Sequence, residues 1–331
     1  MGIDIQYLLF LQRIRQALGG SLDEVFNSFS KFAVGALVVL PIVIYWCASK
    51  DWGTRMYASF NLGCWTLDTL KLTVCAYRPW IRSELVEPAG DSKVAATGYS
   101  FPSGHTLIST TIYGTAAKSQ KPYSKAVYRI LIALILLTAF SRNFLGVHTP
   151  QDVIVGCAMG FGFIWLMGKP YDRIKDNTKV LDIATVIILV LVALGIAYVT
   201  LKPYPMDYVD GKLLVDPLKM MIDAYGSAGE TAGMVIALYL DRHYIHYEVP
   251  KDSPHLAILT VFGVLIVLAW TNHFAGAIIT PLFGVHWGNF LSRLLRGLFA
   301  IGLYPMIIMK YAKQPLKTPL AVKEKEKVKA N

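Results

Sequence analysis

The 331-residue chain is poor in charged residues and in cysteine. Only 16% of its residues are charged, against about 25% in an average soluble domain, while 54% are hydrophobic. The four cysteines lie within or at the ends of apolar segments and form no CxxC pair, which argues against a disulfide framework and a cysteine metal site. Few charges and long apolar stretches along the whole chain exclude an ordinary soluble protein and predict an integral membrane protein.

The few charges are unbalanced, with 32 basic against 22 acidic residues. Lys and Arg gather in short loops and near the C-terminus, as the positive-inside rule describes for membrane proteins. The sequence has no basic face with interleaved aromatic residues, so we expect no nucleic-acid partner. It also has no cluster of carboxylates or of Cys and His with the spacing of a catalytic metal site, so we expect no metal and no cofactor.

Nine apolar runs have lengths close to the roughly 20 residues that cross a bilayer core. We therefore predict an all-α fold, a polytopic membrane helical bundle of about nine transmembrane helices. Residues 273–287 are ambiguous between a tenth span and a re-entrant segment. The runs lie at 32–48, 56–76, 104–118, 127–142, 151–168, 180–201, 217–240, 256–272 and 288–310.

The same pattern divides the chain into four parts. Residues 3–18 are amphipathic, with Arg13 and Arg15 among leucines, which suits a helix lying on the membrane surface or one packed on the bundle. The predicted parts are 1–31, an N-terminal amphipathic segment; 32–201, the first six spans; 202–313, additional C-terminal spans; and 314–331, a basic disordered tail.

Loop charges predict the orientation. Residues 118–129 carry four basic residues and no acid, so this loop is predicted to be cytoplasmic. Residues 202–216 carry three Asp against two Lys and are predicted to face the other side. A nine-span arrangement with the N-terminus outside places both loops on their predicted sides. The same arrangement puts the polar clusters described next on the non-cytoplasmic side.

The first polar cluster contains Lys71 and Arg78, followed by Pro79. Seven residues are about two helical turns, so both cations are predicted to project from one helix face. A cation within a span is costly unless it faces a cavity or a partner, and the alternative is snorkelling toward the head groups. Asp68, one turn before Lys71, is interpreted as a structural ion-pair partner.

The second cluster is Phe101-Pro102-Ser103-Gly104-His105-Thr106. A proline and small residues at a helix start expose backbone N–H groups, which favour an anion. Gly104 allows a ligand close to the backbone, and His105 exchanges a proton near neutral pH. The alternative is a capped helix with an incidental histidine.

The third cluster runs from Ser141 to Asp152. Thr149, Pro150 and Asp152 have the order of a helix N-cap, first turn and third position. Asp152 is then able to reach back to His148 and fix its tautomer, although it could instead serve only as a capping residue. Arg142 offers a planar fork for phosphate oxygens.

Together the clusters resemble the three signature motifs of the type 2 phosphatidic acid phosphatase superfamily. KxxxxxxRP matches 71–79, PSGH matches 102–105 and SRxxxxxHxxxD matches 141–152. The resemblance implies a phosphohistidine on His148, with Asp152 orienting it and His105 as general acid. It also implies phosphate binding by Lys71, Arg78, Ser103, Gly104 and Arg142. The resemblance also implies that 32–201 is a six-helix phosphatase core, as is common in this family. The length and span number are similar to the sphingosine-1-phosphate phosphatase-like and glucose-6-phosphatase-like branches.

The resemblance implies a metal-independent hydrolase acting on a lipid phosphate monoester, with membrane lipids as its other partners. The alternatives are a polyprenyl diphosphate phosphatase and a lipid-to-acceptor phosphotransferase; a transporter is the non-enzymatic alternative. The YSFPSGHT sequence at 99–106 is similar to many bacterial members, which favours a bacterial inner membrane with the site facing the periplasm, or an organelle lumen in a eukaryote. The sequence does not indicate an oligomeric state.

Two features lie beyond these motifs. Gly229 and Gly233 form a GxxxG pattern around Glu230, which favours close helix packing with a paired acid over a polar wall for a substrate head group. His273 and His286 flank the ambiguous segment, and a role for them in substrate access is the less favoured interpretation.

Overall fold

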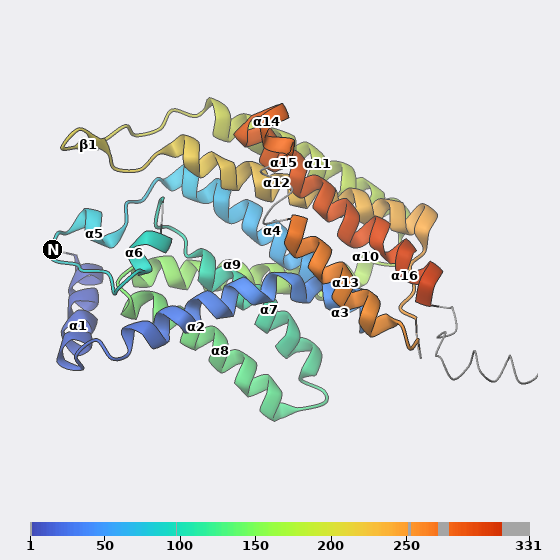
Figure 1. Cartoon of the computed structure of the whole chain (residues 1–331), viewed down its shortest axis with the longest axis horizontal. Coiled ribbons are helices and arrows are strands. Elements are labelled where there is room, and N and C mark those ends of the chain that lie inside the picture. Colours follow the sequence, from blue (N-terminus) through green and yellow to red (C-terminus); the bar gives the residue numbers. More distant parts are fainter. Residues whose placement is uncertain (1, 97, 251–252, 271–277, 313–331) are drawn as a thin grey trace, which may run out of the picture.

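Most of the described chain is helical, and it comprises residues 2–96, 98–250, 253–270 and 278–312 of a computed structural model (Figure 1). Strands in these residues are confined to a short antiparallel hairpin of β1 (Tyr208–Val209) and β2 (Lys212–Leu213). A 3₁₀ turn, η1 (Ala36–Val39), joins α2 to α3, and π-helical turns follow α12 and α15 at η2 (Asp241–Ile245) and η4 (Phe299–Leu303). The α-helices are α1 (Ile3–Ala17), α2 (Asp23–Gly35), α3 (Leu40–Cys47), α4 (Lys50–Val74), α5 (Pro79–Arg82), α6 (Ser92–Ala95), α7 (Gly104–Gln120), α8 (Lys125–Phe144), α9 (Pro150–Leu166), α10 (Lys169–Ile174), α11 (Thr178–Leu201), α12 (Pro217–Leu240), α13 (Leu256–Ala269), α14 (Thr280–Phe283), α15 (Val285–Leu298) and α16 (Tyr304–Ala312).

The predicted apolar runs coincide with helices, but the count of nine spans and the six-helix core are not confirmed. In the described ranges, four helical segments are long and apolar enough to cross a membrane. α4 has 25 residues but carries Arg55, Asp68 and Lys71, and such charges lower its apolar character. The four segments are Lys125–Phe144, Pro150–Ile174, Thr178–Leu201 and Val285–Ala312.

Two boundaries also differ from prediction. The helix expected at 32–48 begins at Asp23, because Asp23 and Glu24 in its first turn favour a helix N-terminus, and it continues through η1 into α3. The described part of the ambiguous segment, 278–287, holds the short α14 and the start of α15, and 273–277 lie outside the described residues. His273 and the tail at 314–331 lie outside the described residues.

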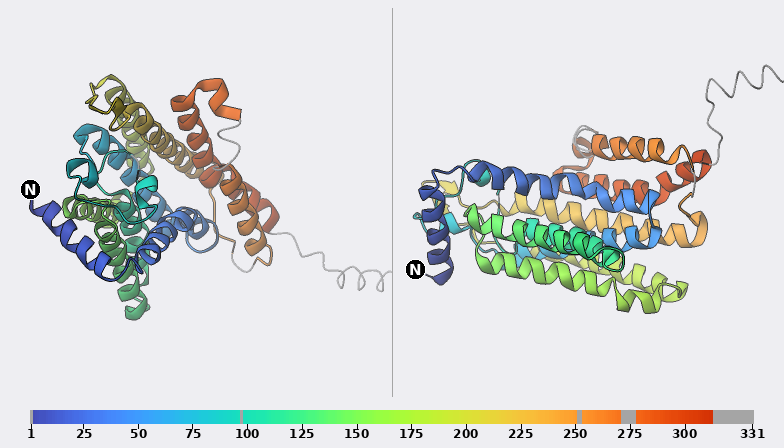
Figure 2. Two further views of the ribbon diagram at one scale, coloured as in Figure 1. Left: turned by 60° about the vertical axis from the view of Figure 1, so that its left-hand side comes forward. Right: turned by 90° about the horizontal axis from the view of Figure 1, so that it is seen from below.

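The long helices run roughly side by side along the longest axis of the molecule (Figure 1). α1 lies across one end of this bundle, nearly perpendicular to the other helices (Figure 2). The same end holds α5, α6 and the β-hairpin, whereas α10 and the turn between α7 and α8 lie toward the opposite end. The ends of α4 and α8 and the starts of α7 and α9 therefore meet at the end that α1 covers.

α1 packs on the bundle and also presents an apolar face outward. Its buried side chains include Leu8, Leu11 and Arg15. Arg15 Nη2 donates to the carbonyl of Glu87 at 2.5 Å, which ties α1 to the loop after α5. On the outer face, Phe10 is 57% exposed. The two interpretations of the amphipathic segment are therefore compatible, because one face of the helix serves the bundle and the other is free for the membrane surface.

The C-terminal helices are joined to the core by glycine contacts and one buried ion pair. A Cβ at Gly229 would overlap the carbonyl oxygen of Phe290, and one at Gly233 would overlap that of Leu294, so α12 and α15 pack backbone to backbone. Glu230 accepts from Arg296 Nη2 at 2.6 Å and from the hydroxyl of Tyr57 on α4. Close packing with a paired acid is therefore confirmed for this GxxxG pattern.

Candidate active site

The turn between α8 and α9 presents His148. Gly146 takes φ +70°, a conformation that glycine adopts without strain, and this reverses the chain after α8. Thr149 is the N-cap of α9 and Pro150 its first residue, as expected from the sequence. Asn143 Nδ2 donates to the carbonyl of His148 at 2.8 Å and fixes the backbone of the turn.

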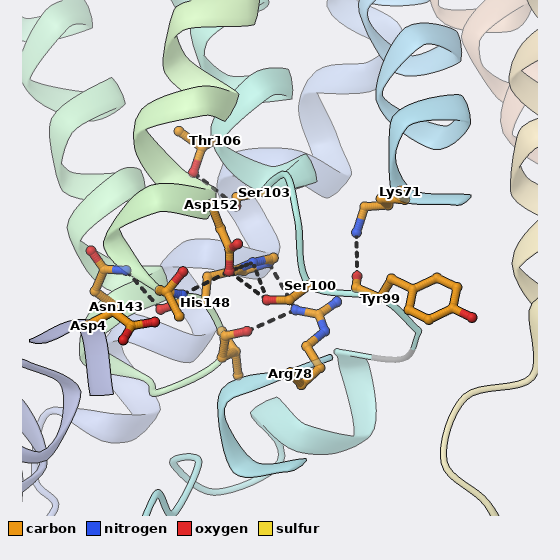
Figure 3. A network of polar contacts seen from close by, with 12 residues as sticks. Asp4, Lys71, Arg78, Tyr99, Ser100, Ser103, Thr106, Asn143, His148 and Asp152 are labelled. Carbon is orange, nitrogen blue, oxygen red and sulfur yellow. Dashed lines mark hydrogen bonds and ion pairs between the residues drawn. The ribbon is translucent and has the colours of Figure 1, made fainter. Parts of the chain in front are cut away.

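His148 and Asp152 form the centre of the site (Figure 3). His148 Nδ1 lies 3.2 Å from Asp152 Oδ2, and both side chains are buried. The same Oδ2 accepts the backbone N–H of Thr149 at 2.8 Å and the hydroxyl of Ser100 at 2.5 Å. The two interpretations of Asp152 are thus not exclusive, since one oxygen both caps α9 and contacts the histidine.

Arg78 contacts the other nitrogen of His148 (Figure 3). Its Nη1 lies 3.0 Å from His148 Nε2 and donates to the carbonyl of Val147 at 2.9 Å, and its Nε donates to the carbonyl of Gly98 at 3.1 Å. A guanidinium only donates, so Nε2 accepts and the proton resides on Nδ1, facing the carboxylate. Both neighbours therefore favour one neutral tautomer with its lone pair on Nε2.

Charge and burial keep His148 neutral. It lies in the turn outside α8 and α9, and burial, followed by the positive charge of Arg78, holds the pKa of His148 well below its usual range. Burial also lowers the pKa of Arg78 to about 10, which leaves this side chain charged at neutral pH. A neutral imidazole beside a guanidinium is a nucleophile next to an anion-binding group.

Lys71 and Arg78 do not share a helix face, which corrects the prediction from their spacing. α4 ends at Val74, Cys75 takes φ 52°, and the chain is extended at Arg78 because Pro79 disfavours a helical residue before it. Lys71 is buried in the last turn of α4, where its Nζ donates to the carbonyl of Tyr99 at 2.9 Å. The two cations reach adjacent carbonyls of the 98–100 segment from different elements.

The second motif begins α7, directly against the start of α9. Ser103 is the N-cap, and its N–H donates to the carbonyl of Asp152 at 2.9 Å, while its hydroxyl accepts from Thr106 at 3.0 Å. Gly104 is the first helical residue, and a Cβ there would meet only Leu67, at an ordinary 3.8 Å. Packing therefore leaves room for a side chain at Gly104, so glycine is not needed there to fit the helix against its neighbours.

His105 follows on the same turn of α7. It is half-buried and within electrostatic range of His148, and the described residues offer its ring no hydrogen bond. This leaves its ring nitrogens available to exchange a proton with a bound group.

Arg142, in the last turn of α8, is held in place by a residue from outside the predicted stretch 32–201. Its Nη1 donates to the hydroxyl of Ser30 on α2 at 2.7 Å. Its Nε is buried and has no hydrogen-bond partner among the residues described. Because an unpaired buried donor is costly, this atom is suited to a bound anion.

Three supporting residues were not identified from the sequence. Ser100 belongs to the YSFPSGHT sequence, so its position beside the second motif was a usable signal. Asn143 lies inside the third motif at a position where the pattern specifies no residue. Ser30 lies in the segment 1–31, outside the predicted core, and carries no local signal.

The arrangement is one of histidines, one acid and cations, not a set of metal ligands. In the described stretches, no group of three or more His, Cys, Asp or Glu is placed to hold a metal ion. Asp152 accepts from Ser100, from the N–H of Thr149 and from His148, and the group that faces Nε2 of the histidine is the cation Arg78.

Comparison with known proteins places these residues in a family. Residues 52–176, which contain all three motifs, match the PAP2 superfamily. The chain is 30% identical over 166 residues to phosphatidylglycerophosphatase B of Bacillus subtilis (strain 168), covering 46% of this chain and 77% of that protein. It is 28% identical over 122 residues to undecaprenyl-diphosphatase of Sulfolobus acidocaldarius, covering 37% of this chain and 56% of that protein. No solved structure has significant similarity. The chain therefore belongs to the PAP2 superfamily.

Proposed function

We propose that this phosphatase hydrolyses the phosphate ester of a membrane lipid, with His148 as its nucleophile and no metal ion. Its family and its phosphatase-named relatives make the chain a phosphoric monoester hydrolase. The observation that carries the proposed mechanism is the environment of His148: Asp152 faces Nδ1, and Arg78 donates to the lone pair of Nε2.

In the first step Nε2 of His148 attacks phosphorus and the bond from phosphorus to the ester oxygen breaks. His105 gives its proton to the leaving alkoxide, so the lipid departs as a neutral alcohol. The phosphorylated ring carries a positive charge, which the carboxylate of Asp152 stabilises through Nδ1–H.

In the second step water attacks the same phosphorus atom. His105, now neutral, takes a proton from this water, the phosphorus–nitrogen bond breaks, and inorganic phosphate leaves with His148 again neutral. Lys71, Arg78 and Arg142 stabilise the charge on the phosphate oxygens in both steps, a role that Mg²⁺ has in other phosphotransfer enzymes. Ser103 and Gly104 contribute the N-terminus of α7.

Arg78 must move before the first step. In the ligand-free protein its Nη1 occupies the lone pair that would attack phosphorus, at 3.0 Å. Phosphate oxygens are stronger acceptors for a guanidinium than a neutral imidazole, because they carry negative charge and can take two parallel hydrogen bonds from its planar fork. Arrival of the phosphate therefore draws Arg78 from Nε2 and frees the nucleophile.

The relatives suggest which substrates to test. One is named a phosphatidylglycerophosphatase and the other an undecaprenyl-diphosphatase. A lipid phosphate monoester such as phosphatidylglycerophosphate is our first candidate, and a polyprenyl diphosphate is the second. Both carry a terminal phosphate on a lipid, which suits a site at the ends of membrane helices.

The decisive experiment measures phosphate release in detergent with EDTA present, for wild type, His148→Ala and His286→Ala. His286 is the matched control because it is a half-buried histidine outside the three motifs, whose Nε2 donates to the carbonyl of Leu218 at 2.8 Å and whose ring lies against Tyr225. The panel holds phosphatidylglycerophosphate, phosphatidic acid, undecaprenyl diphosphate and a sphingoid base phosphate. Release by wild type and His286→Ala, but not by His148→Ala, supports the proposal. Activity that EDTA removes and Mg²⁺ restores contradicts it, and transfer to an added alcohol in place of water supports the phosphotransferase alternative.

We also propose that the site faces the non-cytoplasmic side. Val94 on α6 lies at the catalytic end and is 79% exposed, so it suits an introduced cysteine, whereas its neighbour Ser92 is buried. Val94→Cys should react with an impermeant thiol reagent in right-side-out vesicles. Reaction only in inverted vesicles would reverse the proposed orientation.

A further inference from the structure

A second cavity lies far from the catalytic site. Its volume is about 420 Å³, within the range of roughly 300–1,000 Å³ that small-molecule sites occupy. Its lining includes Lys50 and Thr54 at the start of α4, whereas the catalytic Lys71 is in the last turn of that helix. At 1.5 Å per residue the two ends of α4 are about 30 Å apart. The cavity therefore cannot hold the phosphate that reacts with His148.

The cavity walls are mostly apolar. They are formed by side chains of α4, α9, α11 and α12, among them Leu62, Leu166, Ile188 and Leu238. α11 faces outward with many exposed apolar side chains, such as Ile187, which is 52% exposed. A groove of this kind next to a lipid-facing helix matches a hydrocarbon chain.

The rim of the cavity is cationic. Lys50, Lys175 and Arg242 line it against a single acid, Asp241. Lys50 Nζ pairs with Asp241 at 2.5 Å and Arg242 Nη2 pairs with Asp182 at 2.9 Å, whereas Lys175 Nζ lies 3.9 Å from Asp172, so Lys175 is the least neutralised of the three cations. These residues come from the start of α4, the region after α10 and η2, which meet at one end of the bundle (Figure 1).

Arg242 is only partly satisfied within the protein. Its Nη2 donates to Asp182 at 2.9 Å and to Thr185 at 3.1 Å, so the guanidinium is held in place. Its Nε is a buried donor for which the described part of the chain offers no partner. A fixed guanidinium with a spare donor beside an apolar groove is suited to a phosphate that is attached to a hydrocarbon chain.

We propose that this cavity binds a second lipid, an anionic phospholipid whose phosphate contacts Arg242 and Lys175 and whose acyl chain lies against the apolar walls. Basic pockets between membrane helices bind anionic head groups in this way. Free phosphate would leave the walls empty, and a zwitterionic lipid would gain less from the cationic rim. The proposal does not depend on the catalytic mechanism.

A second apolar cavity of about 300 Å³ provides an internal comparison. It lies between α11, α12 and α15, and its lining, which includes Ala193, Ile236 and Phe290, contains no charged residue. Ala184 lines the cationic cavity on the same helix, α11, as Ala193. The substitutions Ala184→Phe and Ala193→Phe therefore fill two cavities that differ chiefly in charge.

The test is native mass spectrometry of the full-length protein in detergent, titrated with dioleoylphosphatidylglycerol, dioleoylphosphatidylcholine or inorganic phosphate. Arg242→Gln should raise the Kd for phosphatidylglycerol about fivefold, since one cation near a lipid surface contributes about 1 kcal/mol. Ala184→Phe should abolish this binding, and Ala193→Phe should leave it unchanged. Phosphate release from a short-chain lipid phosphate should be the same in all three variants.

If Arg242→Gln does not fold, Lys175→Gln tests the same loss of phosphatidylglycerol binding. Lys175 is exposed and its Nζ lies 3.9 Å from Asp172, so its replacement breaks no close ion pair. Equal binding of the two phospholipids by wild type, or unchanged phosphatidylglycerol binding in Ala184→Phe, would overturn the proposal. Binding of inorganic phosphate that depends on Arg242 but not on Ala184 would also overturn it, in favour of a phosphate-only site.

Discussion

One oxygen of Asp152 accepts three hydrogen bonds, and this makes Asp152→Asn the most informative single change. Oδ2 accepts from Ser100 at 2.5 Å and from the N–H of Thr149 at 2.8 Å, and His148 Nδ1 lies 3.2 Å away. Asparagine has the same shape and retains one carbonyl oxygen, and it is a good residue near a helix start. The substitution therefore removes the negative charge while leaving the cap of α9 largely intact.

The magnitude follows from the distance between Asp152 and His148. In the proposed mechanism the ring becomes positively charged when Nε2 bonds to phosphorus, and a unit charge 3.2 Å from the carboxylate gains about 5 kcal/mol at an effective dielectric constant of about 20. Loss of this term from the transition state lowers the rate by about 10³–10⁴-fold. The equivalent Asp-to-Asn change in the serine-protease triad lowers kcat by about 10⁴, because the carboxylate there also fixes the histidine tautomer and stabilises its positive charge.

The assay is single-turnover phosphate release by rapid quench, with EDTA present and saturating enzyme. Asp91→Asn is the matched control, because Asp91 is an exposed carboxylate at the same end of the molecule and its side chain does not cap α6. Thermal unfolding in detergent checks that Asp152→Asn is folded to the same extent as wild type. A single-turnover rate for Asp152→Asn within tenfold of wild type would refute the electrostatic role of this carboxylate.

Three further predictions rest on individual contacts. Ser100→Ala removes the shortest hydrogen bond to the carboxylate of Asp152 and should lower kcat about tenfold with KM unchanged; a change in KM alone would contradict a positioning role. Gly229→Ala should destabilise the folded protein by about 1–3 kcal/mol because its Cβ overlaps the carbonyl of Phe290, whereas Gly162→Ala, with no atom within 4 Å of its Cβ, should not; equal melting temperatures would refute the close contact. The lowered pKa of His148 means that below pH ~6.5 the unfolded chain binds a proton that the folded chain excludes, so stability should fall with decreasing pH by about 1.4 kcal/mol per unit, and less steeply in His148→Gln; equal slopes in thermal unfolding would refute it.

The sequence by itself determined the helical class, the positions of the main helices and the identity of the motif residues. These features are local: an apolar run of membrane length, or a threonine, proline and aspartate in capping order, specifies a helix and its start without reference to the rest of the chain. The turn that presents His148 is an example, because Gly146, Thr149 and Pro150 encode it within five residues. The number of spans was not fixed in this way, since helices with buried charges such as α4 are long but not uniformly apolar.

Only the tertiary structure decided which groups surround the histidine. Ser100 reaches Asp152 across 52 residues of sequence and Ser30 reaches Arg142 across 112, and contacts of this separation depend on how α2, α7, α8 and α9 pack. The spacing of Lys71 and Arg78 suggested a shared helix face, but the left-handed Cys75 ends the helix between them, and Pro79 holds Arg78 in an extended conformation. Helical periodicity describes one element at a time, whereas the site is assembled from the ends of several helices, and the second cavity likewise exists only where four of them meet.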